Sequence, residues 1–206
     1  MLQYSRKGKI MRKYLAQILL LLVVCGARGQ GFLYDQQVSN INPPGGYNNI
    51  KPDPTGQSFI PTLSSVGFVQ LYLTDPDPNH AGATMYVNLW SGSLPGGTLI
   101  GQTDSISLPG VFLGSANFIF STPPAVTPGT TYYLQPVIQF GDSFDTGILI
   151  VNGYANGFAV FNGLVNLSQD LWFREGIVVP EPSSALLVLA GFVGFYFCRK
   201  RISLRH

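Results

Sequence analysis

Apolar and polar residues alternate along three stretches of this 206-residue chain, residues 84–90, 115–121 and 132–140. Successive side chains of a β-strand point to opposite faces, so alternation predicts strands with one face in a core and one face outward. The residues predicted on the core faces are Met85, Val87, Leu89, Ala116, Phe118, Phe120, Tyr132, Leu134, Ile138 and Phe140. The outward faces of the first and third stretches mix aromatic rings and amides: Tyr86, Asn88, Trp90, Tyr133, Gln135 and Gln139.

Turn signals such as Asp-Pro, Pro-Gly and Asn-Gly recur at short intervals, and the runs between them are rich in β-branched and aromatic residues. The predicted strands are residues 34–41, 57–61, 65–74, 83–91, 97–107, 111–121, 130–140, 147–152, 157–162 and 170–178. Short strands at this spacing predict an all-β fold, an antiparallel β-sandwich of jelly-roll-like form.

Pro136 lies inside the third alternating stretch. Proline has no N–H to donate to a ladder, so it is confined to edge strands and bulges. Pro136 therefore predicts that the strand over 130–140 lies at a sheet edge or carries a bulge.

The run from Gly56 to Ile138 contains GQSFIPTLSSVGFVQLYL, VNLWSGSLPGGTLIGQT and FIFSTPPAVTPGTTYYLQPVI. It resembles the β-sandwich bodies of exported bacterial surface proteins, in particular the galactose-binding-like jelly rolls. This resemblance implies a fold, and a fold does not fix a function.

Continuous apolar runs replace the alternation at both ends of the chain. Near the start, five basic residues in 1–13 precede an apolar run over 15–24 and small residues up to Gly29. This order is typical of a secretory signal peptide, predicted as a signal helix over 1–29 and cleaved after Ala27 or Gly29. Met11 is an alternative start to Met1, and an uncleaved anchor is the alternative to a cleaved signal.

The C-terminal end has three parts in fixed order: Pro180-Glu181-Pro182, the apolar run Ala185–Cys198, and the basic Arg199-Lys200-Arg201. Proline disfavours helix in the residue before it, so a helix can begin only after Pro182. The apolar run gives about 21 Å of helix, short of the roughly 30 Å hydrocarbon core of a bilayer. Its terminal position and its basic cap nevertheless favour a single membrane helix over 184–198 rather than a core helix.

This three-part end resembles the PEP-CTERM sorting signal of Gram-negative bacteria, with Pro180, Glu181, Pro182, Arg199, Lys200 and Arg201 as the matching motif residues. The resemblance implies recognition by an exosortase, a membrane-embedded cysteine transpeptidase that cuts near the PEP. It also implies export through the inner membrane, a membrane-anchored precursor, and delivery to the surface of an organism that makes exopolysaccharide.

The charges are sorted along the chain in a way that supports export. Ten of the twelve Lys and Arg residues lie in the two ends, and residues 30–178 keep only Lys51 and Arg174 against nine acids, a formal charge of −7. Positive-inside logic leaves both ends cytoplasmic and the acidic body translocated. The lack of a basic patch in the body excludes nucleic acid as a partner, and both cysteines, Cys25 and Cys198, lie outside it.

The mixed outward faces are candidates for glycan binding, because exposed rings stack on sugars and neighbouring amides bond their hydroxyls. Tyr86, Asn88, Trp90, Tyr133, Gln135 and Gln139 have the required side chains. The alternative is that Trp90 packs beneath a loop or a neighbouring strand, as tryptophan more often does.

Metal and catalytic signals are weak. Asp75, Asp77 and Asn79 could supply oxygen ligands to calcium, but aspartates in such a stretch more often start turns. His80 is the only histidine between 30 and 178, and no G-x-S-x-G motif occurs. The acids Asp142, Asp145, Asp170 and Glu175 cannot be paired from sequence into the two carboxyls of a glycosidase.

The sequence therefore predicts a signal peptide over 1–29, an exported β-sandwich over 30–178 and a sorting tail over 179–206. The expected function is that of a non-enzymatic protein of the cell surface or extracellular matrix, with no cofactor or metal. Its expected partners are signal peptidase, an exosortase and, transiently, the membrane. The alternatives are an exopolysaccharide-binding module and a secreted glycoside hydrolase, and a clustered Asp/Glu pair in a cleft would favour the hydrolase.

Overall fold

The computed structural model describes residues 30–40, 43–51, 54–150 and 153–180. The predicted signal helix and the predicted membrane helix lie outside these residues. Among the described residues, all regular elements are β-strands, and no helix is long and apolar enough to cross a membrane. Residues Phe32–Val178 form one compact unit.

The strands form two antiparallel sheets of seven strands each. Sheet A contains β1 (Gln30–Val38), β2 (Gly46–Asn49), β4 (Phe68–Thr74), β8 (Leu113–Ile119), β10 (Asp145–Leu149), β13 (Asp170–Leu171) and β14 (Phe173–Pro180). Sheet B contains β3 (Gly56–Phe59), β5 (Ala83–Ser91), β6 (Thr98–Gln102), β7 (Ile106–Leu108), β9 (Tyr132–Gly141), β11 (Ala159–Phe161) and β12 (Leu164–Asn166). The all-β prediction is confirmed.

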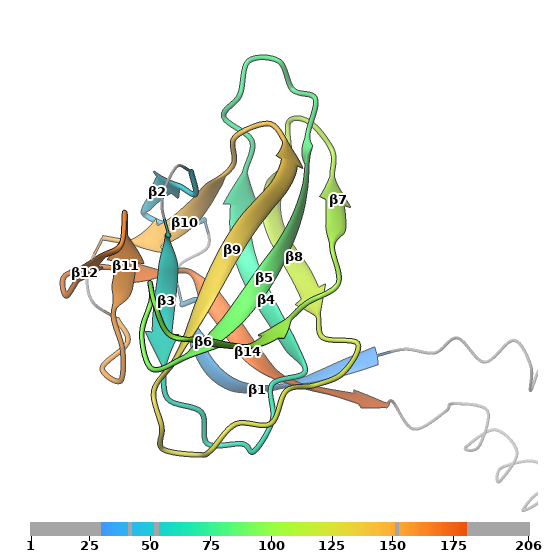
Figure 1. Cartoon of the computed structure of the whole chain (residues 1–206). Helices are drawn as coiled ribbons and strands as arrows, with labels where there is room; N and C mark the ends of the chain where they lie inside the picture. Colours follow the sequence, from blue (N-terminus) through green and yellow to red (C-terminus); the bar gives the residue numbers. More distant parts are fainter. Residues whose placement is uncertain (1–29, 41–42, 52–53, 151–152, 181–206) are drawn as a thin grey trace, which may run out of the picture. The chain divides into compact units, whose positions relative to one another are not determined.

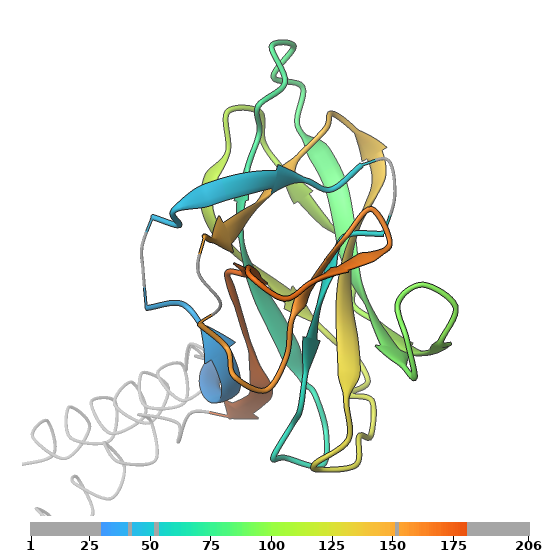
Figure 2. The same cartoon turned by 90° about the vertical axis from the view of Figure 1, so that its left-hand side faces the viewer.

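One apolar core joins the two sheets. Strands β5 and β9 lie in front of β4 and β8 in Figure 1, and Figure 2 shows the same strands from the side of the β11–β12 hairpin. The fully buried core side chains come from both layers: Val69, Leu71 and Leu73 of β4, Phe118 of β8, Met85, Val87 and Leu89 of β5, and Leu134 of β9. Each such side chain stabilises the fold by about 1.5–3 kcal/mol through burial, which makes the core the main source of stability.

The alternation correctly predicts most of the core faces. Met85, Val87 and Leu89 are completely buried, and Ala116, Phe118 and Phe120 are buried on the same pattern. On β9, Tyr132 and Leu134 are buried and Ile138 is half-buried against the core. The outward residues between them keep partial or full exposure, except Asn88 at 8%.

The prediction that Phe140 belongs to the core is wrong, because its side chain is 62% exposed. The β5–β9 register pairs Met85 with Ile138 but Thr84 with Phe140, so Gln139 is an extra residue on β9. Such a bulge shifts the alternation by one position and turns the following side chain to the other face.

Pro136 lies in an interior strand of sheet B, since β9 is flanked by β3 and β5. Its partner on β5 is Val87, whose N–H and C=O both bond Thr103 on the other side. The missing N–H of Pro136 therefore faces β3, whose ladder with β9 ends at Leu134. The strand is therefore not at a sheet edge, although Pro136 itself has no ladder partner on its β3 side. The strand does carry the bulge predicted as the alternative, three residues further along at Gln139.

Two predicted strands are each divided in two. Residues 97–107 form β6 and β7, which pair with different parts of β5 on the same side. Between them, Thr103 Oγ1 accepts the Val87 N–H at 2.9 Å in place of a backbone carbonyl. Residues 170–178 form β13, which pairs with β10, and β14, which pairs with β4. The pairing partner changes at Trp172, whose N–H donates to the Gly147 carbonyl. The short strands β2 and β12 were not predicted.

Candidate functional site

The outward face of sheet B brings together four of the six predicted glycan-binding residues. Cross-strand pairing places Asn88 opposite Gln135 and Trp90 opposite Tyr133. Trp90 Nε1 donates a hydrogen bond to Gln135 Oε1 at 2.8 Å, which fixes the indole beside the amide. The Gln135 Nε2 group has no hydrogen-bond partner among the described residues, so it remains available as a donor.

The remaining two predicted residues lie further along the same face. Tyr86 is half-buried and pairs with Val137, one ladder step beyond Asn88. Gln139 is exposed at the bulge, and its Oε1 accepts a hydrogen bond from the Ser105 hydroxyl at 3.1 Å. Asn88 itself is buried, and its Oδ1 has no partner in the described part of the chain. The half-exposed residues Trp90, Tyr133 and Gln135 are therefore the centre of this surface.

Sequence reasoning missed two members of this surface. Phe158 is hydrogen-bonded through its backbone to Ser58, and its ring lies edge-on to Tyr133 at 6.2 Å between centroids. Leu99 pairs with Trp90 from β6 and is 46% exposed. The four side chains Phe158, Tyr133, Trp90 and Leu99 form a row across the strands, which we call the aromatic row. Only the strand register reveals it.

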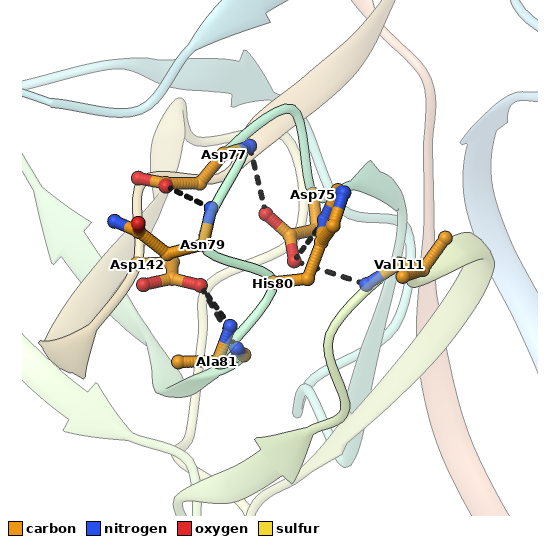
Figure 3. A network of polar contacts seen from close by, with 8 residues as sticks. Asp75, Asp77, Asn79, His80, Ala81, Val111 and Asp142 are labelled. Carbon is orange, nitrogen blue, oxygen red and sulfur yellow. Dashed lines mark hydrogen bonds and ion pairs between the residues drawn. The ribbon is translucent and has the colours of Figure 1, made fainter.

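Two of the three predicted calcium candidates, Asp75 and Asp77, act as hydrogen-bond acceptors in the loop between β4 and β5, and the third, Asn79, donates its backbone N–H (Figure 3). Asp75 is 7% exposed, and its carboxylate accepts the N–H groups of Asp77 and Val111 at 2.9 and 3.0 Å. Asp77 in turn accepts the N–H of Asn79. Val111 has φ 61°, unusual for a β-branched residue, and the Asp75 contact holds its N–H in place.

The aspartates of this loop therefore stabilise turns. Asp142, which lies in the loop between β9 and β10, accepts the N–H groups of Ala81 and Gly82. His80 Nδ1 lies 3.6 Å from Asp75 Oδ2. No group of three or more His, Cys, Asp or Glu side chains able to hold a metal occurs among the described residues.

A carboxyl pair occurs elsewhere, between β1 and β14. Glu175 is completely buried, and its Oε1 accepts the Gln36 N–H at 3.1 Å. Burial, together with the negative charge of nearby Asp35, raises the pKa of Glu175 to about 8. Hydrogen bonds from the Thr62 hydroxyl and from the Thr62 and Leu63 N–H groups outweigh burial and lower the pKa of Asp35.

The Glu175 carboxyl group of this pair is closed to substrates. Glu175 has no exposed surface, and Asp35 already accepts several donors. Three other acids are bonded or partly buried. Asp142 accepts a loop N–H, burial raises the pKa of half-buried Asp145, and Asp170 is fully buried and accepts three N–H donors. The buried acids Asp170 and Glu175 therefore cannot serve as an open glycosidase-like pair.

The sorting motif begins where the sandwich ends. Strand β14 runs from Phe173 to Pro180, so the first proline of the predicted motif is the last residue of a strand in sheet A. The other motif residues, Glu181, Pro182, Arg199, Lys200 and Arg201, lie outside the described residues.

Comparison with family models matches residues 178–201 to the PEP-CTERM protein-sorting motif. The chain therefore carries a PEP-CTERM protein-sorting motif, as its tail predicts. The match covers the tail alone, and its first three residues lie within β14.

The comparisons give less for the sandwich. No curated protein matches the chain. Among solved structures, an arabinose-bound α-L-arabinofuranosidase is similar at 11% identity with a TM-score of 0.35, over 68% of this chain and 24% of the enzyme. The chain thus spans about a quarter of that protein's length, and a likeness this low carries no argument for fold or activity.

Proposed function

We propose that this chain is an exported, non-enzymatic protein that an exosortase sorts to the cell surface or extracellular matrix. A signal peptide removed by signal peptidase would start its export through the inner membrane. The C-terminal tail would hold the precursor in that membrane until it is cut. The observation that carries the proposal is the sorting motif over 178–201.

The way the sandwich enters the motif favours this function. Strand β14 is extended up to Pro180, and its residues 173–176 pair with β4. Proteases and transpeptidases generally bind extended chains, and Pro180 and Pro182 each disfavour helix in the residue before them. The sandwich, in which a jelly-roll order remains a prediction, would be the cargo that the cut releases.

Cell fractionation with sorting variants tests this proposal. Replacing Pro180-Glu181-Pro182 with Ala-Gln-Ala should leave the sandwich in the membrane fraction. Replacing Arg199, Lys200 and Arg201 with glutamine should weaken retention of the precursor, because these cations hold the tail at the cytoplasmic side. A matched change outside the motif, Lys51→Gln, should leave distribution unchanged. Normal surface delivery of the Ala-Gln-Ala variant would contradict the proposal.

A second function, glycan binding, is favoured by the aromatic row. Trp90 and Tyr133 face outward side by side, and Gln135 presents a free amide donor next to the indole. Such a surface offers ring faces for stacking and polar groups that fix orientation. We propose that the row binds exopolysaccharide at the cell surface.

The variant Trp90→Ala separates this function from a structural role. Binding to an array of immobilised polysaccharides should weaken, while the melting temperature changes little because Trp90 is only half-buried. Phe140→Ala is the matched control, since it removes an exposed ring from the same sheet away from the row. A large fall in melting temperature for Trp90→Ala, or unchanged binding, would contradict glycan binding.

A hydrolase is the least favoured function. Glu175 of the carboxyl pair Asp35–Glu175 is completely buried between strands, so a substrate would have to separate β1 from β14 to reach its carboxyl group. We therefore keep the non-enzymatic proposal.

A further inference from the structure

The outward face of sheet A carries an arginine held in an unusual environment. The Arg174 guanidinium lies between two rings, 5.3 Å from the centroid of Tyr34 and 4.9 Å from that of Trp172. Its Nε donates to Ser39 Oγ at 2.8 Å, and its Nη1 donates to Gln70 Oε1 at 3.1 Å. Rings and neutral acceptors thus fix the orientation of the guanidinium.

The charge of Arg174 has no acidic partner among the residues that the structure describes. Among the described residues, the only contact within ion-pair distance joins His80 to Asp75, so no carboxylate neutralises this cation. The Nη2 group also has no hydrogen-bond partner in the described part of the chain. A half-buried arginine with a free donor and an uncompensated charge is suited to bind an anion, and carboxylates match its planar fork.

The side chains around Arg174 indicate which anion fits. Tyr34 is 40% exposed beside the guanidinium. Asn117 is exposed, and its Oδ1 accepts the Gln70 amide at 2.7 Å, which leaves its own Nδ2 free as a donor among the described residues. Ser39 also lines a hollow of about 320 Å³ with Gln37, Val38, Asn40 and Gly153. A ring face, an amide donor and a fixed guanidinium are the groups that recognise a sugar bearing a carboxylate.

A peptide ligand fits this surface less well. One common way to bind an extended peptide is to add it as a strand to a free sheet edge. Arg174 lies on β14, which is flanked by β1 and β4, and Gln70 lies on β4, which is flanked by β14 and β8. Both strands are interior, so the ligand must be recognised by side chains alone.

We infer that the face formed by Tyr34, Ser39, Gln70, Asn117 and Arg174 binds a carboxylated sugar, such as a uronic acid unit of an acidic polysaccharide. The carboxylate would take the free edge of the Arg174 guanidinium, and the sugar would lie against Tyr34 with a hydroxyl bonded to Asn117 Nδ2. This site is separate from the aromatic row of sheet B and does not depend on the sorting proposal.

The full chain in detergent micelles tests the inference by calorimetric titration with tri-galacturonic acid and with its neutral methyl ester. The acid should bind about tenfold or more tightly than the ester, because the ester cannot accept a charge-assisted bond from Arg174. Arg174→Gln should remove this preference. Lys51→Gln removes the body's other positive charge and should change nothing. Trp90→Ala should also leave the acid's affinity unchanged.

Equal affinity for acid and ester would overturn the inference, as would equal weakening by Arg174→Gln and Lys51→Gln, which would indicate long-range charge alone. If Arg174→Gln lowers the melting temperature strongly, Asn117→Asp is the second variant. It keeps the acceptor for Gln70 and places a negative charge on the exposed face. Asn117→Asp should weaken binding of the acid and spare the ester, and an unchanged preference for the acid would overturn the inference.

Discussion

The β5–β9 ladder and the polar region that contains Gln57 of β3, Asp170 of β13 and Glu175 of β14 are stabilised in different ways. In the ladder, Met85, Val87, Leu89 and Leu134 are completely buried and contribute through apolar contact. In the second region the buried side chains include Gln57, Asp170 and Glu175, which contribute through hydrogen bonds. The first region should respond to lost volume, and the second to lost partners or changed charge.

The hydrogen bonds of the second region are continuous. Gln57 Nε2 donates to Asp170, Asp170 accepts the Tyr154 N–H, and the Tyr154 hydroxyl bonds Gln36 Oε1. The Gln36 N–H then reaches Glu175, which lies beside Asp35. We call the residues Gln57, Asp170, Tyr154, Gln36, Glu175 and Asp35 the polar network. It connects strands of both sheets, so its loss should weaken their association.

Asp170→Ala should have the largest effect on stability. Asp170 is fully buried and accepts bonds from Gln57 Nε2 and from the N–H groups of Gly153 and Tyr154, at 2.8–3.0 Å. Removal takes the only acceptor from the buried Tyr154 N–H and one of two acceptors from buried Gln57 Nε2, and should lower the free energy of unfolding by about 3–5 kcal/mol. Urea denaturation measures this. Asp170→Asn, which keeps acceptor oxygen, should cost less, and a loss below about 1 kcal/mol for Asp170→Ala would show that the network is dispensable.

Leu134→Ala should be the next largest and tests the ladder. Leu134 is completely buried in the core between the two sheets. Truncation removes buried apolar atoms and leaves a cavity, and together these should lower the free energy of unfolding by about 2–5 kcal/mol. Its effect should be the same at pH 5 and pH 9, because no charge is involved. A loss that depends strongly on pH would mean that the ladder and the polar network are coupled.

Glu175→Gln should change the pH dependence of stability. The folded-state pKa of about 8 lies above the usual value, because burial and the charge of Asp35 disfavour the carboxylate. The contribution of Glu175 is therefore complete below the unfolded pKa near 4.5 and is lost as pH rises through about 8.

At pH 9, Glu175→Gln should be more stable than the parent by on the order of 1–3 kcal/mol, with little gain at pH 4. The other titratable groups facing Glu175 are Asp35 and Tyr154, and the pKa of Tyr154 is raised by burial to about 12. Neither titrates between pH 5 and 9, so the difference belongs to Glu175. The exposed control Asp104→Asn should show no such change, and parallel pH profiles for Glu175→Gln and the parent would refute the shift.

Phe140→Ser should have the smallest effect and sharpens the comparison within one strand. The bulge at Gln139 turns Phe140 outward, so its loss should change the free energy of unfolding by no more than about 0.5 kcal/mol. Leu134 lies six positions earlier on β9 and should cost several times more. A cost for Phe140→Ser close to that of Leu134→Ala would mean that the alternation continues through the bulge.

The same contrast explains what the sequence could predict. Alternation is local, so Met85, Val87 and Leu89 were placed correctly, and Trp90 and Tyr133 were placed outward. The bulge that exposes Phe140 has no local signal, because it depends on pairing with β5.

The polar network was not predictable, because its bonds join residues far apart in the sequence: Gln36 to Glu175 spans 139 positions, and Gln57 to Asp170 spans 113. The candidate surfaces follow the same rule. Residue types suggested Trp90, Tyr133 and Gln135, but the positions of Phe158 and Leu99 beside them depend on strand order. The sorting tail was predictable because its three parts are consecutive.

The intact mass of the native surface protein tests the proposed sorting most directly. If an exosortase cuts the chain near the PEP, the mature protein should lack Ala185–His206 and end near Pro180, the last residue of β14. The sandwich should remain folded, because β14 pairs with β4 through residues 173–176. A surface protein whose mass still includes His206 would show that the tail is a permanent anchor and would contradict the proposed sorting.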